Sequence, residues 1–258
     1  MCIRDRITPA VPFFFFYPQV LLHLLLRNGC ETPLERVFIF YVHELNYEKV
    51  DLNVPFSEKR AQIGLLARMI TNAIFLSHAL REQTTIRIFI QKKVPHIMQL
   101  KSETIRYLGP SERSFAAIGR KAERLFEEKL GENWFEANPG LLVRKTDNPL
   151  TDFEEAFSKP VTIATVRFAS GNNLLIERDS PTKLSLQDFE NKILALTERA
   201  QTIIFPIQLP DNPGLESILA NNVQAMTNYQ QEHLLLRKRL ESAQLVAVIN
   251  LILDKKSK

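Results

Sequence analysis

IIFPIQLPDNPG, residues 203–214, joins four apolar residues and a proline to a polar tail that holds two more prolines and a glycine. A β-branched and aromatic run followed by such a tail is typical of a buried strand that ends in a rigid turn. In α/β proteins, ligands bind in the crevice at the carboxyl ends of such strands. The segment therefore either holds a cofactor or only turns the chain.

Strands and helices alternate along the chain on both sides of this segment. Strands are predicted at 37–45, 84–91, 97–105, 141–145, 161–169 and 201–209, and helices at 61–81, 109–131, 148–158, 185–200, 215–233 and 243–256. Ser111 is the expected N-cap of the second helix and Gly131 its expected end. Residues 132–140 are predicted to turn, and 233–240 fit a helix or a strand. Residues 243–256 also fit a strand that passes into a helix. The pattern predicts one α/β domain whose mostly parallel sheet has helices on both faces.

Composition and charge point to one stretch of the surface. The 258 residues are 45% hydrophobic and 24% charged, with a formal net charge of +4, which is ordinary for a globular protein. Residues 81–124, however, carry ten Lys or Arg against four Glu. A locally basic stretch in a near-neutral chain indicates either a nucleic-acid surface or an ordinary solvated face.

Several common catalytic motifs are missing from the sequence. It contains no GxGxxG, P-loop, HExxH or GxSxG pattern, and its five histidines are scattered. These absences argue against the usual dehydrogenase, kinase and hydrolase classes and against a metal site. Cys2 and Cys30 are the only cysteines, so we expect no disulfide framework and a reduced, cytoplasmic setting.

The first 35 residues differ from the rest of the chain. An apolar segment follows Arg4 and Arg6, as in a signal peptide, but Pro12 and Pro18 interrupt it well before the roughly 20 residues of a membrane span. MCIRDR also resembles a translated sequencing-adapter remnant. We therefore expect residues 1–35 to be non-native or translated upstream sequence, no membrane partner, and a single domain over 36–258.

Five stretches resemble one family when they are taken in order. The stretches are FLSHALR (75–81), LGPSERS (108–114), NPGLLVRK (138–145), IIFPIQLPDNPGLESIL (203–219) and AQLVAVINLILDKK (243–256). In order and spacing they are similar to segments of the archaeal tRNA pseudouridine N1-methyltransferases, the TrmY family of the SPOUT class. In that family the first stretch ends a long helix, the fourth is a cofactor loop, and the last is the C-terminal knot helix.

The resemblance implies a SPOUT fold, whose C-terminal segment is threaded into a trefoil knot. It also implies a homodimer, S-adenosyl-L-methionine as methyl donor, and direct methyl transfer to a pseudouridine in the T-loop of tRNA. The donor would be held largely by backbone groups of three loops. The residues that the resemblance places there are Pro206, Leu209, Leu234, Leu235, Leu236, Leu240 and Leu245.

The sequence departs from the family pattern in these same loops. Pro206 and Pro210 replace glycines, and a proline has no backbone N–H. Leu234–Leu236 and Arg237 replace the Ser-Leu-Gly/Ser-Pro of the knot loop, and Leu245 replaces a cysteine. Two interpretations stay open: an active methyltransferase with a modified donor site, or a decayed paralogue that binds RNA as a dimer without methyl transfer. A third is an unrelated α/β interaction domain.

Five basic side chains are the candidates for contact with the RNA. Arg113 and Arg144 are expected to orient the substrate, and His78, Arg81 and Arg237 to contact it. Each has a structural alternative. His78 would cap a helix or lie in the core, and Arg81 and Arg113 would be solvated beside neighbouring glutamates. Residues 234–240 would form an ordinary amphipathic segment.

Overall fold

The computed structural model describes residues 34–43, 45, 47, 58–150, 161–168, 182–209, 218–219 and 229–256. Residues 33–258 form one unit. The N-terminal segment, nearly all of the helix predicted at 148–158 and most of the helix predicted at 215–233 lie outside the described residues, as does Pro210.

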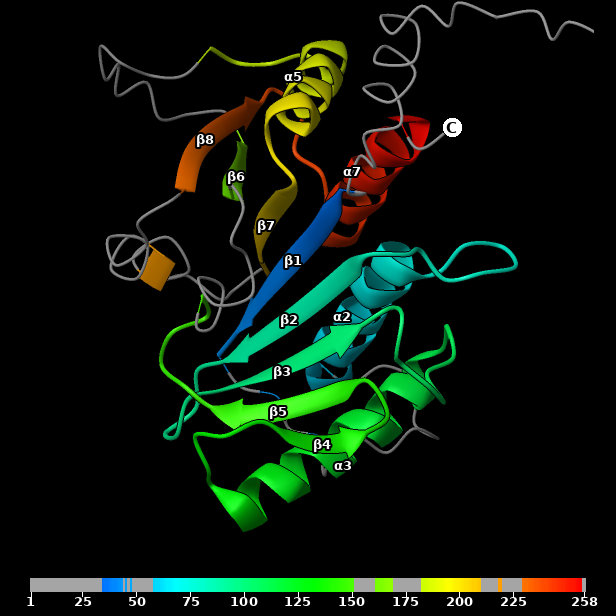
Figure 1. Cartoon of the computed structure of the whole chain (residues 1–258), viewed down its shortest axis with the longest axis vertical. Helices are drawn as coiled ribbons and strands as arrows, with labels where there is room; N and C mark the ends of the chain where they lie inside the picture. The colour runs from blue at the N-terminus through cyan, green and yellow to red at the C-terminus, as the bar shows by residue number, and fades with distance from the viewer. Residues whose placement is uncertain are drawn as a thin grey trace, which may run out of the picture. The chain divides into compact units, whose positions relative to one another are not determined.

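An eight-stranded sheet in the order β4-β5-β3-β2-β1-β7-β6-β8 forms the centre of this unit (Figure 1). Its strands are β1 (Glu35–Val42), β2 (Thr84–Ile90), β3 (His96–Lys101), β4 (Phe135–Asn138), β5 (Leu141–Lys145), β6 (Val161–Phe168), β7 (Thr202–Gln208) and β8 (Tyr229–Leu236). The block from β2 to β8 is parallel, whereas β3, β5 and β4 continue the sheet with antiparallel pairing. The predicted α/β class with a largely parallel sheet is confirmed.

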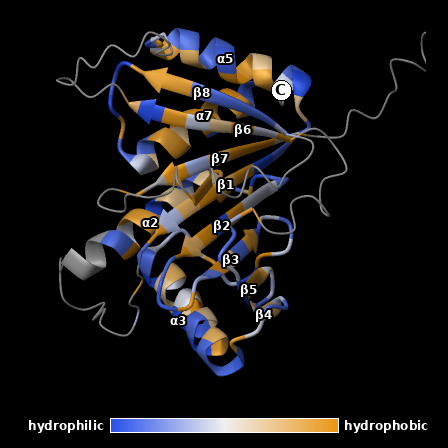
Figure 2. Ribbon diagram, turned by 90° about the vertical axis from the view of Figure 1, so that its left-hand side faces the viewer, coloured by the Kyte–Doolittle hydropathy of each residue, from blue (hydrophilic) through white to orange (hydrophobic). Residues whose placement is uncertain are grey.

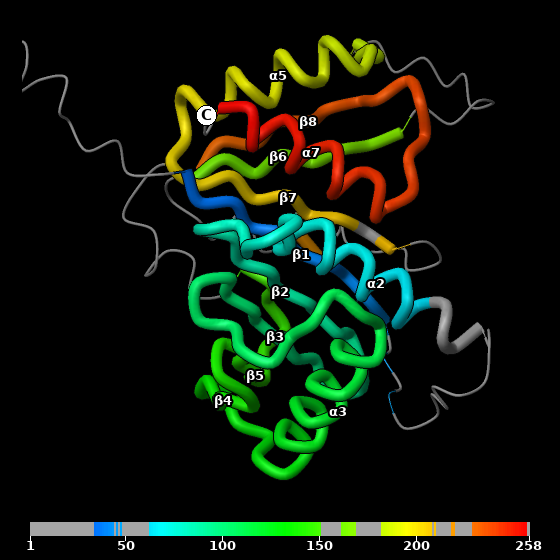
Figure 3. The backbone as a smooth tube through the Cα atoms, turned by 90° about the vertical axis from the view of Figure 1, so that its right-hand side faces the viewer, coloured from blue at the N-terminus to red at the C-terminus, as the bar shows by residue number. Residues whose placement is uncertain are grey.

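Four helices pack on one face of the sheet, where Figure 3 shows α2, α3 and α7 in front of the strands. They are α2 (Glu58–Ile74), α3 (Glu112–Lys129), α5 (Leu186–Arg199) and α7 (Ser242–Lys256). The β1–β2 and β6–β7 connections advance in the same direction along the sheet. Crossovers between parallel strands share one hand, which explains why α2 and α5 lie on the same face. Helices on both faces were expected. The smaller apolar core on the opposite face includes Leu150, Ile218 and Leu219 from the connections.

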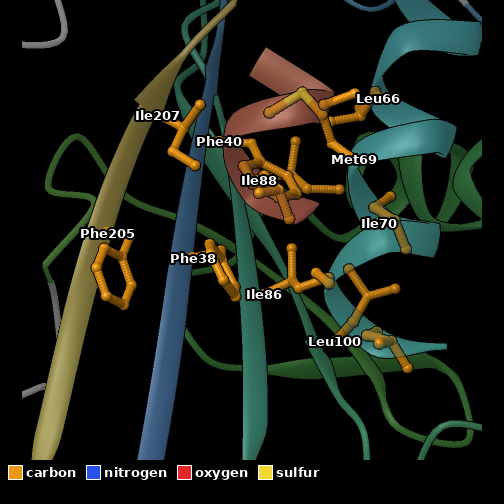
Figure 4. Close-up of a cluster of buried hydrophobic side chains, with 14 of the residues drawn as sticks. Phe38, Phe40, Leu66, Met69, Ile70, Ile86, Ile88, Leu100, Phe205 and Ile207 are labelled. Carbon is orange, nitrogen blue, oxygen red and sulfur yellow. The ribbon is translucent and has the colours of Figure 1, made fainter. Parts of the chain in front are cut away.

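The central strands are buried on both faces, which explains their nearly continuous apolar sequence. Phe38 and Phe40 of β1 pack toward the helices with Ile86 and Ile88 of β2, against Met69 and Ile70 of α2 (Figure 4). The alternate residues Val37, Ile39 and Tyr41 belong to a smaller core on the other face. The sheet therefore supports a core on each side.

Helix α2 ends at Ile74 rather than at the predicted residue 81. Residues 75–80 form a tight turn closed by a bridge between Phe75 and Leu80, and residues 76–79 are exposed. The reason is the guanidinium of Arg81. Its Nη1 donates to the carbonyl oxygens of Asn72, Ala73 and Phe75 at 2.8, 3.3 and 3.0 Å and so satisfies the end of the helix.

Helix α3 begins as predicted and ends differently. The side chain of Ser111 accepts a hydrogen bond from the Ser114 N–H at 3.2 Å, which confirms the N-cap. At the other end Leu130, not Gly131, adopts the left-handed conformation, with φ of 44°. Gly131 is needed for space instead, because a β-carbon there would lie 2.5 Å from the Phe135 ring. That ring belongs to β4, where the sequence predicted only a turn.

Strand β8 replaces the end of a predicted helix. Residues 229–233 were expected to be helical, but Tyr229–Leu236 pairs with Val161–Phe168 of β6 along its whole length. The pairing partner lies more than 60 residues earlier in the chain, so local periodicity could not reveal it. By contrast, α5 and α7 form where they were predicted, and α5 starts with a capping box between Ser185 and Asp188.

Candidate functional site

The direction of the chain connections changes at β7. The connections that follow β1 and β6 carry α2 and α5 on the helical face. The connection that follows β7 places Ile218 and Leu219 in the core of the opposite face. In open α/β sheets, ligands bind outside the carboxyl ends of strands where connections diverge in this way. The carboxyl end of β7 is therefore the candidate site.

The sheet splits at this same place. β6 pairs with β7 only as far as Ile163 and Ile204. Beyond that point β7 stays alongside β1 to Gln208, while β6 stays alongside β8 to Phe168, and the two strands diverge in Figure 3. Pro206 lies two residues past the last pair and has no N–H to donate. It therefore lies at the split within β7, rather than in the loop where the family resemblance placed it.

The leucines predicted at the cofactor site belong mostly to the core. Leu209, Leu234, Leu236 and Leu245 are buried members of the main apolar cluster, and Leu240 packs against that cluster. Leu234–Leu236 lie in β8, so the expected knot loop is a strand here, and the loop proper is 237–241. Three successive leucines favour an extended strand over the turn that serine, glycine and proline would form. A ligand at this edge would meet backbone groups more than leucine side chains.

The loop 237–241 is held at both ends by hydrogen bonds. The Arg237 N–H donates to the Leu184 carbonyl oxygen at 3.1 Å, and Arg237 Nε donates to the Lys183 carbonyl oxygen at 3.2 Å. At the start of α7, the Glu241 N–H donates to Oε1 of Gln244 at 3.0 Å. Ligand sites combine apolar walls with a few polar groups, such as backbone N–H and C=O. The backbone of this loop and the leucines beside it provide both kinds of group for S-adenosyl-L-methionine, the cofactor that the resemblance implies.

Arg237 is exposed at the start of this loop, and Lys238 and Arg239 beside it are also exposed. Among the residues predicted to contact RNA, Arg237 is the one that lies at the same edge of the sheet as the candidate site. Three consecutive cations at the carboxyl edge form a positive rim, which attracts phosphate groups.

The two arginines expected to orient the substrate are not brought together. Arg113 is exposed in the first turn of α3, on the helical face of the sheet. Arg144 of β5 lies on the other face, where its guanidinium carbon is 5.4 Å from the centre of the Trp134 ring. Arg87 of β2 lies over the same ring at 5.9 Å. The sequence analysis did not single out Trp134, although it is the only tryptophan.

His78 and Arg81 lie at the end of α2, where Arg81 makes structural contacts. His78 is exposed in the turn after the helix. Arg81 caps the helix and its Nε lies 2.9 Å from Oδ2 of Asp254 in α7, with its side chain only 13% exposed. The same carboxylate pairs with Nη1 of Arg36 at 2.6 Å. Arg81 therefore links the end of α2 to α7. Its contact with RNA stays a prediction.

A buried charged cluster under α3 was not indicated by the sequence. His96 is fully buried, with Nε2 3.1 Å from Oε1 of Glu123 and Nδ1 3.2 Å from the Val94 carbonyl oxygen. Lys92 Nζ lies 3.0 Å from the other carboxylate oxygen. Burial alone would raise the pKa of Glu123, but the hydrogen bond and charge of His96 and the ion pair with Lys92 outweigh it, so the pKa is lowered. Both ring nitrogens of His96 therefore lie within hydrogen-bond distance of an oxygen atom.

Two further kinds of feature are missing from the described part of the chain. There, no three His, Cys, Asp or Glu side chains gather closely enough to hold a metal ion. Among the helices built from described residues, none has the length and apolar character needed to cross a membrane.

Comparison with known proteins gives the same family as the sequence motifs. Residues 51–158 match the family model described as "Putative SAM-dependent RNA methyltransferase". The chain is 26% identical over 137 residues to the tRNA (pseudouridine(54)-N(1))-methyltransferase of Haloferax volcanii, covering 53% of this chain and 62% of that protein. Proteins of the same name from Methanospirillum hungatei and Methanococcoides burtonii are 36% and 31% identical, over 37% and 47% of this chain and 50% and 60% of their own lengths.

These matches span between half and about three fifths of each relative. The family match over residues 51–158 includes α2, β2, β3, α3, β4 and β5. The resemblance found in the sequence is confirmed: this chain is similar to the tRNA pseudouridine N1-methyltransferases, and its residues 51–158 match the RNA methyltransferase family.

Proposed function

We propose that this chain is a methyltransferase that uses S-adenosyl-L-methionine to methylate N1 of a pseudouridine in the T-loop of tRNA. The names of the relatives support this substrate, and the family description supports this methyl donor. The single observation that carries the proposal is the split at the carboxyl end of β7. There β6 and β7 separate, and the loop 237–241 with its three cations lies at the same edge of the sheet.

The residues of this edge have separable roles in the proposal. Backbone groups of Leu209 and of 237–241 would hold the donor, which supplies an electrophilic methyl group when bound. Arg237, Lys238 and Arg239 would hold RNA phosphates beside it. Arg113 and Arg144 remain the proposed substrate-orienting groups. The acceptor base would be extruded from the T-loop to reach the donor, so the protein's contribution is chiefly positioning.

We also propose the trefoil knot that the resemblance implies, and a homodimer. Support for the knot comes from strand β8. β6 pairs with one edge of β8, while Leu184, at the far end of the β6–α5 connection, pairs with the other edge. The chain then runs from β8 to α7, which packs against both α5 and α2. In the proposed knot, 237–241 would carry the chain from between these two partners of β8 to α7.

Calorimetric titration of S-adenosyl-L-methionine into the full chain tests the proposal first. A dissociation constant in the micromolar range, about −7 to −8 kcal/mol, would show that the split holds the donor. Methyl transfer is then measured on tRNA that carries pseudouridine and on the same tRNA with uridine. Transfer to the first substrate only is the expected result. Lys238→Glu should weaken transfer through KM, whereas Lys192→Glu on the exposed side of α5 is the matched control.

One observation favours a second candidate, a decayed paralogue that binds RNA without methyl transfer. Pro206 removes a backbone donor at the split itself. If the chain binds tRNA but gives no heat and no thermal shift with millimolar donor, the second candidate is correct. Restoration of donor binding by Pro206→Gly would then identify the proline as the cause.

A further inference from the structure

Tyr107 combines an exposed ring with a strained backbone. It lies between β3 and α3, with 83% of its surface exposed and φ of 63°. A bulky residue at positive φ is an outlier, because its β-carbon crowds the backbone. An exposed ring gains little from folding, so burial does not account for a tyrosine at this position.

The backbone around Tyr107 is fixed by hydrogen bonds with residues 138–139 and with Ser114. The Arg106 N–H donates to the Pro139 carbonyl oxygen at 3.0 Å, and the Arg106 carbonyl oxygen accepts from Nδ2 of Asn138 at 3.1 Å. Ser114 Oγ donates to the Tyr107 carbonyl oxygen at 3.3 Å and accepts from the Gly109 N–H at 2.7 Å. Strained conformations persist where the surroundings over-determine them, and they cluster at functional sites.

The ring projects from a basic neighbourhood. Arg106 is exposed beside it, and Arg113 is exposed in the first turn of α3. Lys121 of α3 reaches Oδ1 of Asn138 at 3.4 Å, and Asn138 in turn holds the Arg106 carbonyl. Figure 2 shows hydrophilic stretches along α3, whose exposed basic residues are Arg113, Arg120, Lys121, Arg124 and, in the last turn, Lys129. The loop of Tyr107 and this helix therefore form one surface.

We propose that Tyr107 is a stacking platform for an unpaired RNA base, with the neighbouring cations on the adjoining phosphates; this rests on the proposed RNA substrate. Unstacked bases are recognised by stacking on aromatic side chains, and phosphates by arginine and lysine. A ring on a fixed backbone loses little conformational entropy on binding. A protein partner fits less well. The other large exposed apolar side chains of the described residues, Leu76, Leu130, Leu186 and Leu251, lie on other elements and extend no apolar patch around Tyr107.

The test compares two glycine substitutions at positions with the same backbone strain. Tyr107→Gly removes the ring and relieves the positive φ. Leu130→Gly relieves φ of 44° at an exposed residue at the other end of α3 from Arg113. Tyr107→Phe keeps the stacking face. Each full-length variant is titrated by fluorescence anisotropy against a labelled RNA hairpin with an unpaired loop and against a fully paired RNA duplex. Its Tm is measured in parallel.

We expect Tyr107→Gly to weaken hairpin binding by about tenfold, roughly the effect of losing one base stack, without lowering the Tm. Duplex binding should not change, and Tyr107→Phe and Leu130→Gly should bind the hairpin as the wild type does. Equal hairpin binding by wild type and Tyr107→Gly overturns the proposal, and so does an equal loss on the duplex. A wild type that binds no hairpin also overturns it.

Methyl transfer by the wild type separates this proposal from the proposed function. Transfer to tRNA together with binding that does not depend on Tyr107 would leave the function standing and reject the stacking role. Binding that depends on Tyr107 without any transfer would support the stacking role and reject the methyltransferase.

Discussion

Gly64 and Gly119 are both helical glycines, but their surroundings are opposite. A β-carbon at Gly119 would lie 2.6 Å from the buried ring of Tyr47, whereas one at Gly64 would lie 3.4 Å from the flexible end of Glu112. We expect Gly119→Ala to lower the free energy of unfolding by about 1–3 kcal/mol through overpacking. Gly64→Ala should raise it by about 0.5–1 kcal/mol, because alanine is the better helix former. Urea denaturation measures both, and shifts of the same sign would contradict this packing.

Glu123 gives the molecule a defined acid sensitivity. Its pKa in the folded protein is below the usual 4.5, so the ionised carboxylate stabilises the fold at pH values above 4.5. That contribution is lost as the pH falls through the lowered pKa. Glu123→Gln should cost about 2 kcal/mol at neutral pH and less in acid, where the wild-type carboxylate is also uncharged.

The measurement for Glu123 is the difference in free energy of unfolding between wild type and variant from pH 7 downward. Taking the difference cancels the contribution of other carboxyls, such as Glu35, whose pKa is raised by burial. A difference that stays constant down to the most acid pH would show that the ion pairs with His96 and Lys92 do not stabilise the fold.

Asp254 anchors helix α7 to two other elements of the fold. The carboxylate joins α7 to β1 through Arg36 and to the end of α2 through Arg81, and these arginine side chains are only 7% and 13% exposed. Asp254→Asn would leave two nearly buried guanidinium groups without their counter-charge. We expect a loss of about 2–3 kcal/mol in the free energy of unfolding.

The neighbouring Lys255 provides the control for Asp254. It pairs with Glu190 of α5 at 2.6 Å, but its side chain is 53% exposed. Lys255→Gln should cost no more than about 1 kcal/mol. Hydrogen exchange of the α7 amides should increase strongly in the Asp254 variant only. Equal effects of the two substitutions would show that α7 is held by apolar packing alone.

Elements whose determinants are local could be predicted from the sequence, and those with distant determinants could not. Ser111 caps α3 with the N–H three residues later, and the prediction is confirmed. The end of α2 depends on Arg81, which lies beyond the helix, and β8 depends on β6. For the site, strand ends predicted the carboxyl edge of the sheet, which is also where the candidate site is proposed. The split arises because β6 pairs with β7 over only three residues and with β8 along its whole length. Pairing between strands that are distant in the sequence leaves no local sequence pattern.

The charge of the whole molecule is almost balanced, so RNA binding must depend on how charge is distributed. Residues 125–160 carry eight acidic and four basic residues, directly after the basic stretch. On α3 this change falls between Arg124 and Glu127, both exposed. The first turns of the helix are therefore attractive to phosphates and the last turns repel them.

This polarity predicts how salt affects RNA affinity. A side chain that neutralises a phosphate releases counterions, so its removal lowers the slope of log K against log salt by about 0.7–0.9. Arg113→Gln and Arg124→Gln should each produce that decrease. Glu128→Gln in the last turns of α3 and Lys192→Gln on α5 should not, although both residues are exposed and both substitutions change the net charge by one. Equal slopes for all four variants would mean that RNA lies elsewhere, and the cations of 237–239 would be the next to substitute.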